Sequence, residues 1–164
     1  MSSFTGALLD LHVILSLLEI PVGVALLFAM FGGRAPRRLT LAFLVLAALT
    51  SLTGFPLPPP GFDPARAIGL LSLALTAIAA YAYVVGHVQG AWRAIFVIAA
   101  VATLYLDVFV AIVQAFQKLA FLQPLAPTQS EPPFLIAQAI CLAVFVAAGA
   151  LAVTRIRRSA AIAG

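Results

Sequence analysis

Residues 93–118 read RAIFVIAAVATLYLDVFVAIVQAFQK, and this stretch decides the fold class because it is long enough to cross a lipid bilayer as one helix. A single carboxylate, Asp107, interrupts the apolar run near its middle. At about 1.5 Å per helical residue, Asp107 lies roughly 21 Å from Arg93 and roughly 16 Å from Lys118. The sequence therefore predicts an acid deep inside a hydrocarbon layer about 30 Å thick.

The composition of the whole chain agrees with a membrane location. Of the 164 residues, 64% are hydrophobic and only 9% are charged, and the mean hydropathy is +1.17. Soluble domains carry about a quarter charged residues, so a soluble chain of this length could not hide this much apolar surface. We expect an all-α integral membrane protein in which residues 1–164 form one transmembrane domain.

Five apolar runs predict a bundle of five antiparallel transmembrane helices. The Gly32-Gly33 pair and Pro36 end the first run, and proline-rich connectors at 55–64 and 123–133 separate later ones. Asp63 before Pro64 is typical of a helix start. The segment from Ser130 to Pro133 has the same character. The expected spans cover residues 8–31, 39–54, 65–87, 91–121 and 134–154.

The distribution of basic residues predicts the orientation. The net charge is +4, from nine Lys and Arg against five acids. With five spans, most basic residues fall on one side, which by the positive-inside pattern faces the cytoplasm. We expect the N-terminus outside and the C-terminus in the cytoplasm. The cytoplasmic set is Arg34, Arg37, Arg38, Arg93, Arg155, Arg157 and Arg158, and the other side holds Arg66 and Lys118.

Two further features bear on location and partners. The first run lacks a basic leader and a small-residue cleavage site, so it predicts a retained span and not a signal peptide. Abundant Ala, Gly, Pro and Arg are compatible with GC-rich codons, which favours the inner membrane of a bacterium. Because the basic residues sit at span ends, orientation explains them, and nucleic acid is not an expected partner.

The first run carries a polar stripe. His12, Ser16, Glu19 and Gly23 are separated by four, three and four residues, a spacing that puts them on one helix face. Pro21 frees a backbone carbonyl beside Glu19, so the helix is expected to bend there.

The fourth run carries a matching stripe. Thr103, Asp107, Gln114 and Lys118 share one face with alanines, a pattern that favours contact with protein over contact with lipid. Glu19 and Asp107 have similar predicted depths on antiparallel helices. If the stripes face each other, the two acids could share a proton, bind a cation, or be neutralised by His12 and hydroxyl groups.

These stripes define the candidate site. The proton- or cation-binding candidates are Glu19, Asp107 and His12, and residues expected to line an outer mouth are Gln114, Lys118, Gln138 and Glu131. Intramembrane acids are functional candidates by default, but they can also be protonated and hydrogen-bonded between helices, or paired with another subunit. For His12 alone, a satisfied interfacial histidine is the simpler interpretation.

Other chemistries receive little support. The sequence contains no HExxH, CxxC or GxSxG motif, so no catalytic or metal site is predicted and an enzyme is not favoured. Cys141 lies in an apolar run, which disfavours a nucleophile. His12 and His87 belong to opposite ends of the bundle and cannot bind one haem together, whereas His87 with Met30 stays geometrically possible.

Three classes of function remain. The first is a small proton- or cation-coupled carrier with a carboxylate site near the middle of the membrane. The second is an accessory or assembly subunit of a larger respiratory or photosynthetic complex, and the third is an intramembrane haem- or quinone-binding redox module. The expected partners are the lipid bilayer and either further copies of the chain or other membrane subunits; the sequence assigns no cofactor.

Overall fold

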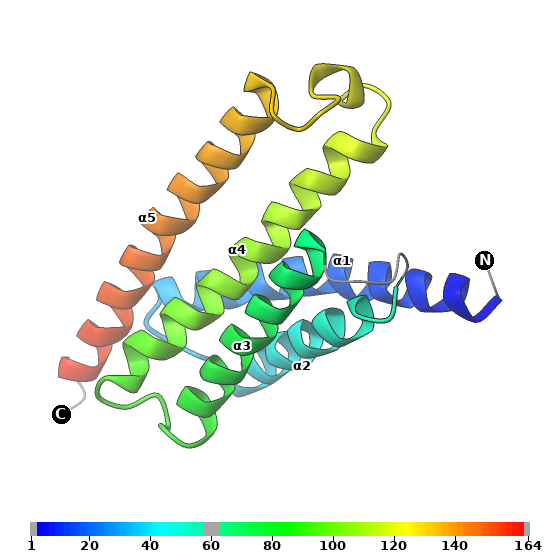
Figure 1. Ribbon diagram of the computed structural model, residues 1–164. Coiled ribbons are helices and arrows are strands. Elements are labelled where there is room, and N and C mark those ends of the chain that lie inside the picture. The colour runs from blue at the N-terminus through cyan, green and yellow to red at the C-terminus, as the bar shows by residue number, and fades with distance from the viewer. Residues whose placement is uncertain (1–2, 58–62, 163–164) are drawn as a thin grey trace.

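The computed structural model describes residues 3–57 and 63–162 and is helical throughout this part of the chain (Figure 1). No strand occurs among these residues, and all five long helices have the length and hydropathy needed to cross a membrane. This confirms the all-helical class and is compatible with a multi-pass membrane protein. The elements are α1 (Ser3–Phe31), α2 (Arg37–Gly54), α3 (Pro64–Val84), α4 (Trp92–Lys118), the 3-10 helix η1 (Gln123–Leu125) and α5 (Pro132–Ile162).

The start of α3 follows the predicted capping chemistry. Asp63 Oδ1 accepts a hydrogen bond from the backbone N–H of Arg66 at 2.9 Å, and Pro64 is the first helical residue. Arg66 also forms an ion pair with Asp63 and donates to the carbonyls of Phe55 and Leu57. Arg66 therefore connects the end of α2 to the start of α3. Residues 58–62 of the predicted polyproline connector lie outside the described residues.

Helix ends differ from the predicted spans where apolar pattern and backbone geometry disagree. The fourth helix stops at Lys118 and not at 121, because Leu119 adopts an extended backbone (φ −84°, ψ 118°) that leads into η1. The fifth helix continues beyond 154 to Ile162, since the segment after Thr154 contains no Gly or Pro until Gly164. The first helix is already formed at Ser3 and runs through Pro21 without a break in helical structure.

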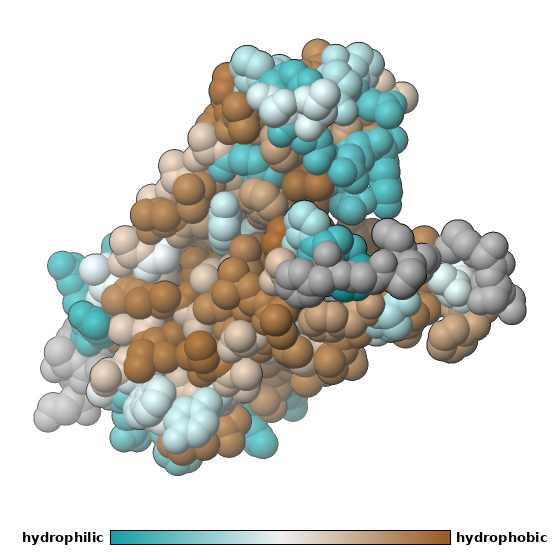
Figure 2. Space-filling model, in the orientation of Figure 1, coloured by the Kyte–Doolittle hydropathy of each residue, from teal (hydrophilic) through white to brown (hydrophobic). Residues whose placement is uncertain are grey.

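Successive helices run in alternate directions, so the end of α1, the start of α2, the end of α3, the start of α4 and the end of α5 gather at one end of the molecule (Figure 1). This end, which we call the basic end, holds Arg34, Arg37, Arg38, Arg93, Arg155, Arg157 and Arg158. Towards the opposite end the α4–α5 pair diverges from the α1–α2 pair (Figure 1). Apolar surface covers most of the helical faces in view (Figure 2).

The packed core lies in the basic half. Side chains from all five helices form one buried apolar cluster there, with Phe43, Phe96 and Met30 among its largest members. In the opposite half, a small second cluster of Phe116, Ala126 and Phe134 joins α4 to α5. Glu19 and Asp107, from the two polar stripes, lie between these two clusters. His12 and Lys118 lie further towards the end opposite the basic one.

Candidate functional site

The acids Glu19 and Asp107, one on each of two apolar helices, are neighbours. Glu19 from α1 is completely buried, at 0% exposure, and its carboxyl group lies close enough to that of Asp107 on α4 for the two to interact. The hydroxyl-bearing side chain of Thr50, on α2, is a further neighbour of Glu19. Three helices therefore contribute to one buried polar cluster where α1 crosses α2 and α4.

The carboxyl oxygens of this pair lack donors. The described residues donate no hydrogen bond to Glu19 Oε1, Glu19 Oε2 or Asp107 Oδ2. No described Lys, Arg or His forms an ion pair with either acid. Two ionised carboxylates at such close range in a low dielectric repel each other strongly. One proton held between them would supply the missing donor, because a carboxylic acid donates through its O–H group.

Gly23 lies next to the Glu19–Asp107 pair, on the side that faces the basic end. Gly23 lies one turn beyond Glu19, and a Cβ atom there would come within 2.6 Å of Leu104 Cδ1 and 2.8 Å of Phe43 Cε2. The missing side chain lets α1 approach both α2 and α4. Immediately beyond Gly23 the apolar core begins, so the pair is separated from the basic end by packed side chains.

His12 connects to the same cluster through Thr50. Its Nδ1 atom lies 3.1 Å from the carbonyl oxygen of Thr50 and 3.1 Å from Thr53 Oγ1. Because a carbonyl can only accept, the first contact assigns the proton of a neutral ring to Nδ1 and leaves Nε2 as an acceptor. Thr50 thus contacts His12 through its backbone and neighbours Glu19 through its side chain. Lys118 is also near enough to His12 to interact with it electrostatically.

The predicted mouth residues fall into separate environments. Gln138 on α5 donates from Nε2 to the carbonyl of Phe109 at 3.2 Å, while its Oε1 is buried without a partner. Gln114 and Lys118 are exposed on α4. Hydrophilic surface is visible near the end of α4, on the side that faces α1 across a hollow (Figure 2).

Glu131 is bound within its own loop. Its carboxylate accepts from the backbone N–H of Thr128 at 3.1 Å, from Thr128 Oγ1 at 2.8 Å and from the N–H of Ser130 at 3.1 Å. Loss of hydration opposes ionisation, but these hydrogen bonds outweigh it and lower the pKa of Glu131. The residue immediately precedes α5, so its observed contacts order the start of that helix.

Sequence reasoning missed the contribution of α2. Thr40, Ala47, Thr50 and Gly54 are separated by seven, three and four residues and so share one helix face, the same signal that marked the stripes on α1 and α4. Thr40 and Thr50 are both buried. Hydroxyl residues at helical spacing within a span are common, so this pattern alone does not identify Thr50 as a neighbour of Glu19.

The remaining candidates are dispersed. Met30 is buried in the apolar core, whereas His87 is exposed at the turn between α3 and α4. Cys141 is a buried free thiol on α5. Within residues 3–57 and 63–162, no group of three or more His, Cys, Asp and Glu side chains could hold a metal ion.

Comparison of the chain with protein-family models, with curated proteins and with solved structures found no match.

Proposed function

We propose that the protein is a proton-coupled membrane carrier in which Glu19 and Asp107 together form the proton-exchange site. The observation that carries the proposal is the direct contact of two buried carboxyl groups that have no cationic partner among the described residues. Such a pair binds one proton tightly and a second only when the local environment changes. A carrier needs this property, because it must take up and release protons at one site in different states.

The polar contacts favour access from the end opposite the basic one. Thr50 and His12 continue the polar cluster in that direction, and Lys118 lies near His12. The apolar core that begins at Gly23 and Leu104 blocks the other direction. With the basic end in the cytoplasm of a bacterial inner membrane, the described conformation would correspond to a carrier that exchanges protons with the outside.

The first experiment measures proton movement directly. The full chain is reconstituted in liposomes that contain a pH-sensitive dye, a potassium diffusion potential is imposed, and internal acidification is followed. Glu19→Gln and Asp107→Asn each remove one member of the pair while conserving shape. We expect both variants to lose the proton flux of the wild type, because neither can exchange a proton between two carboxyl groups.

Asp10→Asn is the matched control, since Asp10 lies on the same helix as Glu19 but is exposed. It should conduct protons as the wild type does. Equal flux in wild type, Glu19→Gln and Asp107→Asn would contradict the proposal. Failure of both pair variants to accumulate in the membrane would instead assign the carboxyl pair a purely structural role.

A second candidate function rests on the uncovered polar face of α4. Gln114 and Lys118 are exposed where the helix pairs diverge, and a helix from another copy or from another membrane subunit could cover them there. Purification in mild detergent tests this alternative. Stable association with respiratory or photosynthetic proteins would favour an accessory subunit, and an active preparation of this chain alone would favour the carrier.

A further inference from the structure

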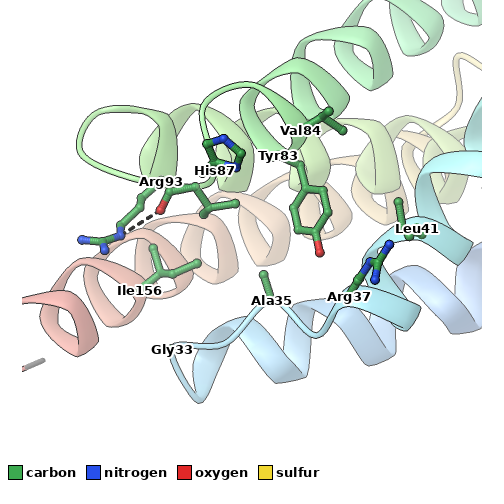
Figure 3. Close-up of a pocket in the computed structure, with 10 residues that line it drawn as sticks. Gly33, Ala35, Arg37, Leu41, Tyr83, Val84, His87, Arg93 and Ile156 are labelled. Atoms are coloured by element: carbon green, nitrogen blue, oxygen red, sulfur yellow. Dashed lines mark hydrogen bonds between the residues drawn. The ribbon is translucent and has the colours of Figure 1, made fainter.

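A groove at the basic end lies outside the carboxyl site. It has a volume of about 750 Å³ and is formed between the α1–α2 turn, the end of α3 and the start of α4. Arg37, Arg93, His87 and Tyr83 contribute its polar lining. Figure 3 shows the Tyr83 ring pointing from α3 towards the α1–α2 turn, between Arg37 and Arg93, whose guanidinium groups lie at opposite ends of the groove, with that of Arg93 directed away from Tyr83.

The turn that carries His87 is tightly built. His87 and Val88 both have positive φ, at 49° and 52°, a conformation that a β-branched residue rarely adopts. A Cβ on Gly86 would come within 2.3 Å of Trp92 Cγ, so only glycine fits there. Arg93 Nε donates to the carbonyl of Val88 at 2.9 Å (Figure 3), which fixes the turn and leaves both terminal guanidinium nitrogens for another partner.

The positive charge of the groove is not compensated by the chain. All five acids, Asp10, Glu19, Asp63, Asp107 and Glu131, belong to other parts of the sequence, and no described acid forms an ion pair with Arg37 or Arg93. The groove also lies at the starts of α2 and α4, and neither helix has a side-chain cap. At the start of α4 the N–H groups of Trp92, Ala94 and Ile95 donate to backbone carbonyls, so the helix-start contribution to anion binding comes from α2, beside Arg37. Two arginines, an imidazole and a phenol around one groove are donors suited to phosphate oxygens.

Apolar residues decide between a lipid and a soluble anion. Leu41 and Val84 line the groove and are themselves 38% and 60% exposed, so the groove opens onto apolar surface. An acyl chain can leave the groove along this surface, whereas a free phosphate would gain nothing from it. Trp92 packs against Tyr81 in a tilted geometry, with 5.3 Å between ring centroids and an interplanar angle of 57°, beside the same turn, and aromatic residues of this kind are typical of the membrane–water interface.

We propose that this groove binds the phosphate headgroup of an anionic phospholipid, with Arg37 contacting the phosphate oxygens, Arg93 adding positive charge at the other end of the groove, and the first acyl carbons lying against Leu41 and Val84. The cytoplasmic leaflet is rich in anionic lipids, and basic recesses between transmembrane helices are suited to their headgroups. The lipid would connect α2 to the α3–α4 turn. This assignment does not depend on the carrier function, since the groove and the carboxyl pair share no residue.

The test uses delipidated full-length protein in detergent. Its thermal unfolding is measured against the concentration of a short-chain phosphatidylglycerol, of the phosphatidylcholine with the same chains, and of inorganic phosphate. We expect stabilisation by phosphatidylglycerol at concentrations at least about tenfold lower than by phosphatidylcholine, because the charged hydrogen bonds need a net anionic headgroup. Arg37→Gln should raise the half-saturating concentration of phosphatidylglycerol by about tenfold, and Arg37→Lys by less.

Neighbouring arginines provide the controls. Arg38→Gln and Arg157→Gln remove the same charge from the basic end at positions that do not line the groove, and both should respond as the wild type does. Equal weakening by Arg38→Gln would reduce the effect to general electrostatics and overturn the site. Equal stabilisation by phosphatidylcholine would exclude headgroup recognition. Stabilisation by inorganic phosphate as strong as that by phosphatidylglycerol would show a soluble-anion site and overturn the lipid assignment.

Discussion

The basic half and the opposite half of this bundle are built differently. In the basic half, side chains from five helices meet in one apolar core that includes Phe43 and Phe96, and glycine allows α1 to approach its neighbours closely. In the opposite half, the helix pairs diverge (Figure 1): α4 and α5 are joined by the small cluster around Phe116, and α1 and α2 by the contacts of His12 with Thr50 and Thr53. The carboxyl pair lies at the boundary between the two.

The apolar packing of the basic half is thus spatially separate from the acids and His12. Buried hydroxyl groups without partners occur in both halves, as Thr40 and Thr50 show. The interacting acids and His12, however, lie at the boundary or beyond it, on the side away from the core. A charged or protonatable group is easier to satisfy where helices separate and water can enter than within a packed apolar core. If this division is correct, equivalent substitutions in the two halves will have unequal effects.

The largest difference is expected between two phenylalanines. Phe96 is 0% exposed in the main core, and Phe116 is 7% exposed in the small cluster. Phe→Ala in a packed soluble core costs about 3–5 kcal/mol, and Phe96→Ala should approach the lower end because an apolar lipid environment reduces the transfer contribution. Phe116→Ala should cost less than half as much, since fewer neighbours surround it. Equilibrium unfolding in mixed micelles of mild detergent and dodecyl sulfate measures both values.

Equal losses from Phe96→Ala and Phe116→Ala would break the comparison. They would mean that the α4–α5 contact in the opposite half is as important for stability as the core. Leu104→Ala gives a second value for the basic half, since Leu104 is also buried in the core next to Gly23.

A smaller difference is expected between two buried threonines. Thr50→Val removes the hydroxyl group beside Glu19 but keeps the carbonyl that contacts His12. The Thr50 hydroxyl has no hydrogen-bond partner among the described residues, but it can donate a hydrogen bond to Glu19 when that carboxyl group is ionised. Such a hydrogen bond of about 1 kcal/mol corresponds to roughly a fivefold change in rate, so proton flux in dye-loaded liposomes should fall by about that factor. Thr40→Val replaces an unpartnered buried hydroxyl in the basic half with a methyl group and should leave flux unchanged.

The two valine variants also report stability. Thr40→Val should be neutral or stabilising, because it removes a buried polar atom without a partner. If Thr40→Val lowers flux as much as Thr50→Val does, the proton-exchange site is not confined to the boundary between the halves.

The sequence was sufficient to predict the all-helical class and the existence of five helices long and apolar enough to cross a membrane. Hydropathy over about 20 residues identifies a span without knowledge of its neighbours, and the caps at Asp63 and near Ser130 are local signals that the structure confirms. Helix ends were less accurate. The end at Lys118 depends on the backbone angles of Leu119, which the apolar pattern does not report.

The candidate site was predictable only in part. The spacing of His12, Glu19 and Gly23 predicted one shared helix face and depth predicted Asp107 at the same level, and the structure places Glu19 and Asp107 next to each other. Which helix completes the cluster depends on packing angles between helices, and the sequence has no signal that Thr50 of α2 lies there. Glu131, by contrast, belongs to a helix start that the sequence predicts, because its hydrogen-bond partners lie within three residues of it along the chain.

The smallest effect is expected at Glu131, in the loop that closes the opposite half. Hydrogen bonds from Thr128 and Ser130 lower the pKa of Glu131 despite its partial loss of hydration. The stabilisation is therefore present above the pKa of a free glutamate, about 4.3, and is lost as pH falls through the lower pKa of the folded state. Glu131→Gln should lower the melting temperature by on the order of 1–2 °C at neutral pH.

The difference between wild type and Glu131→Gln should vanish in acid, because the protonated carboxyl group and the amide then accept similar hydrogen bonds. Thr128→Val removes one donor, the hydroxyl at 2.8 Å, and should reproduce part of the loss with the same pH dependence. A difference that persists unchanged at low pH would show that the charge of Glu131 contributes nothing at this helix start. The loop would then be held by its other contacts, such as the hydrogen bond from Gln129 Nε2 to the carbonyl of Val113 at 3.0 Å.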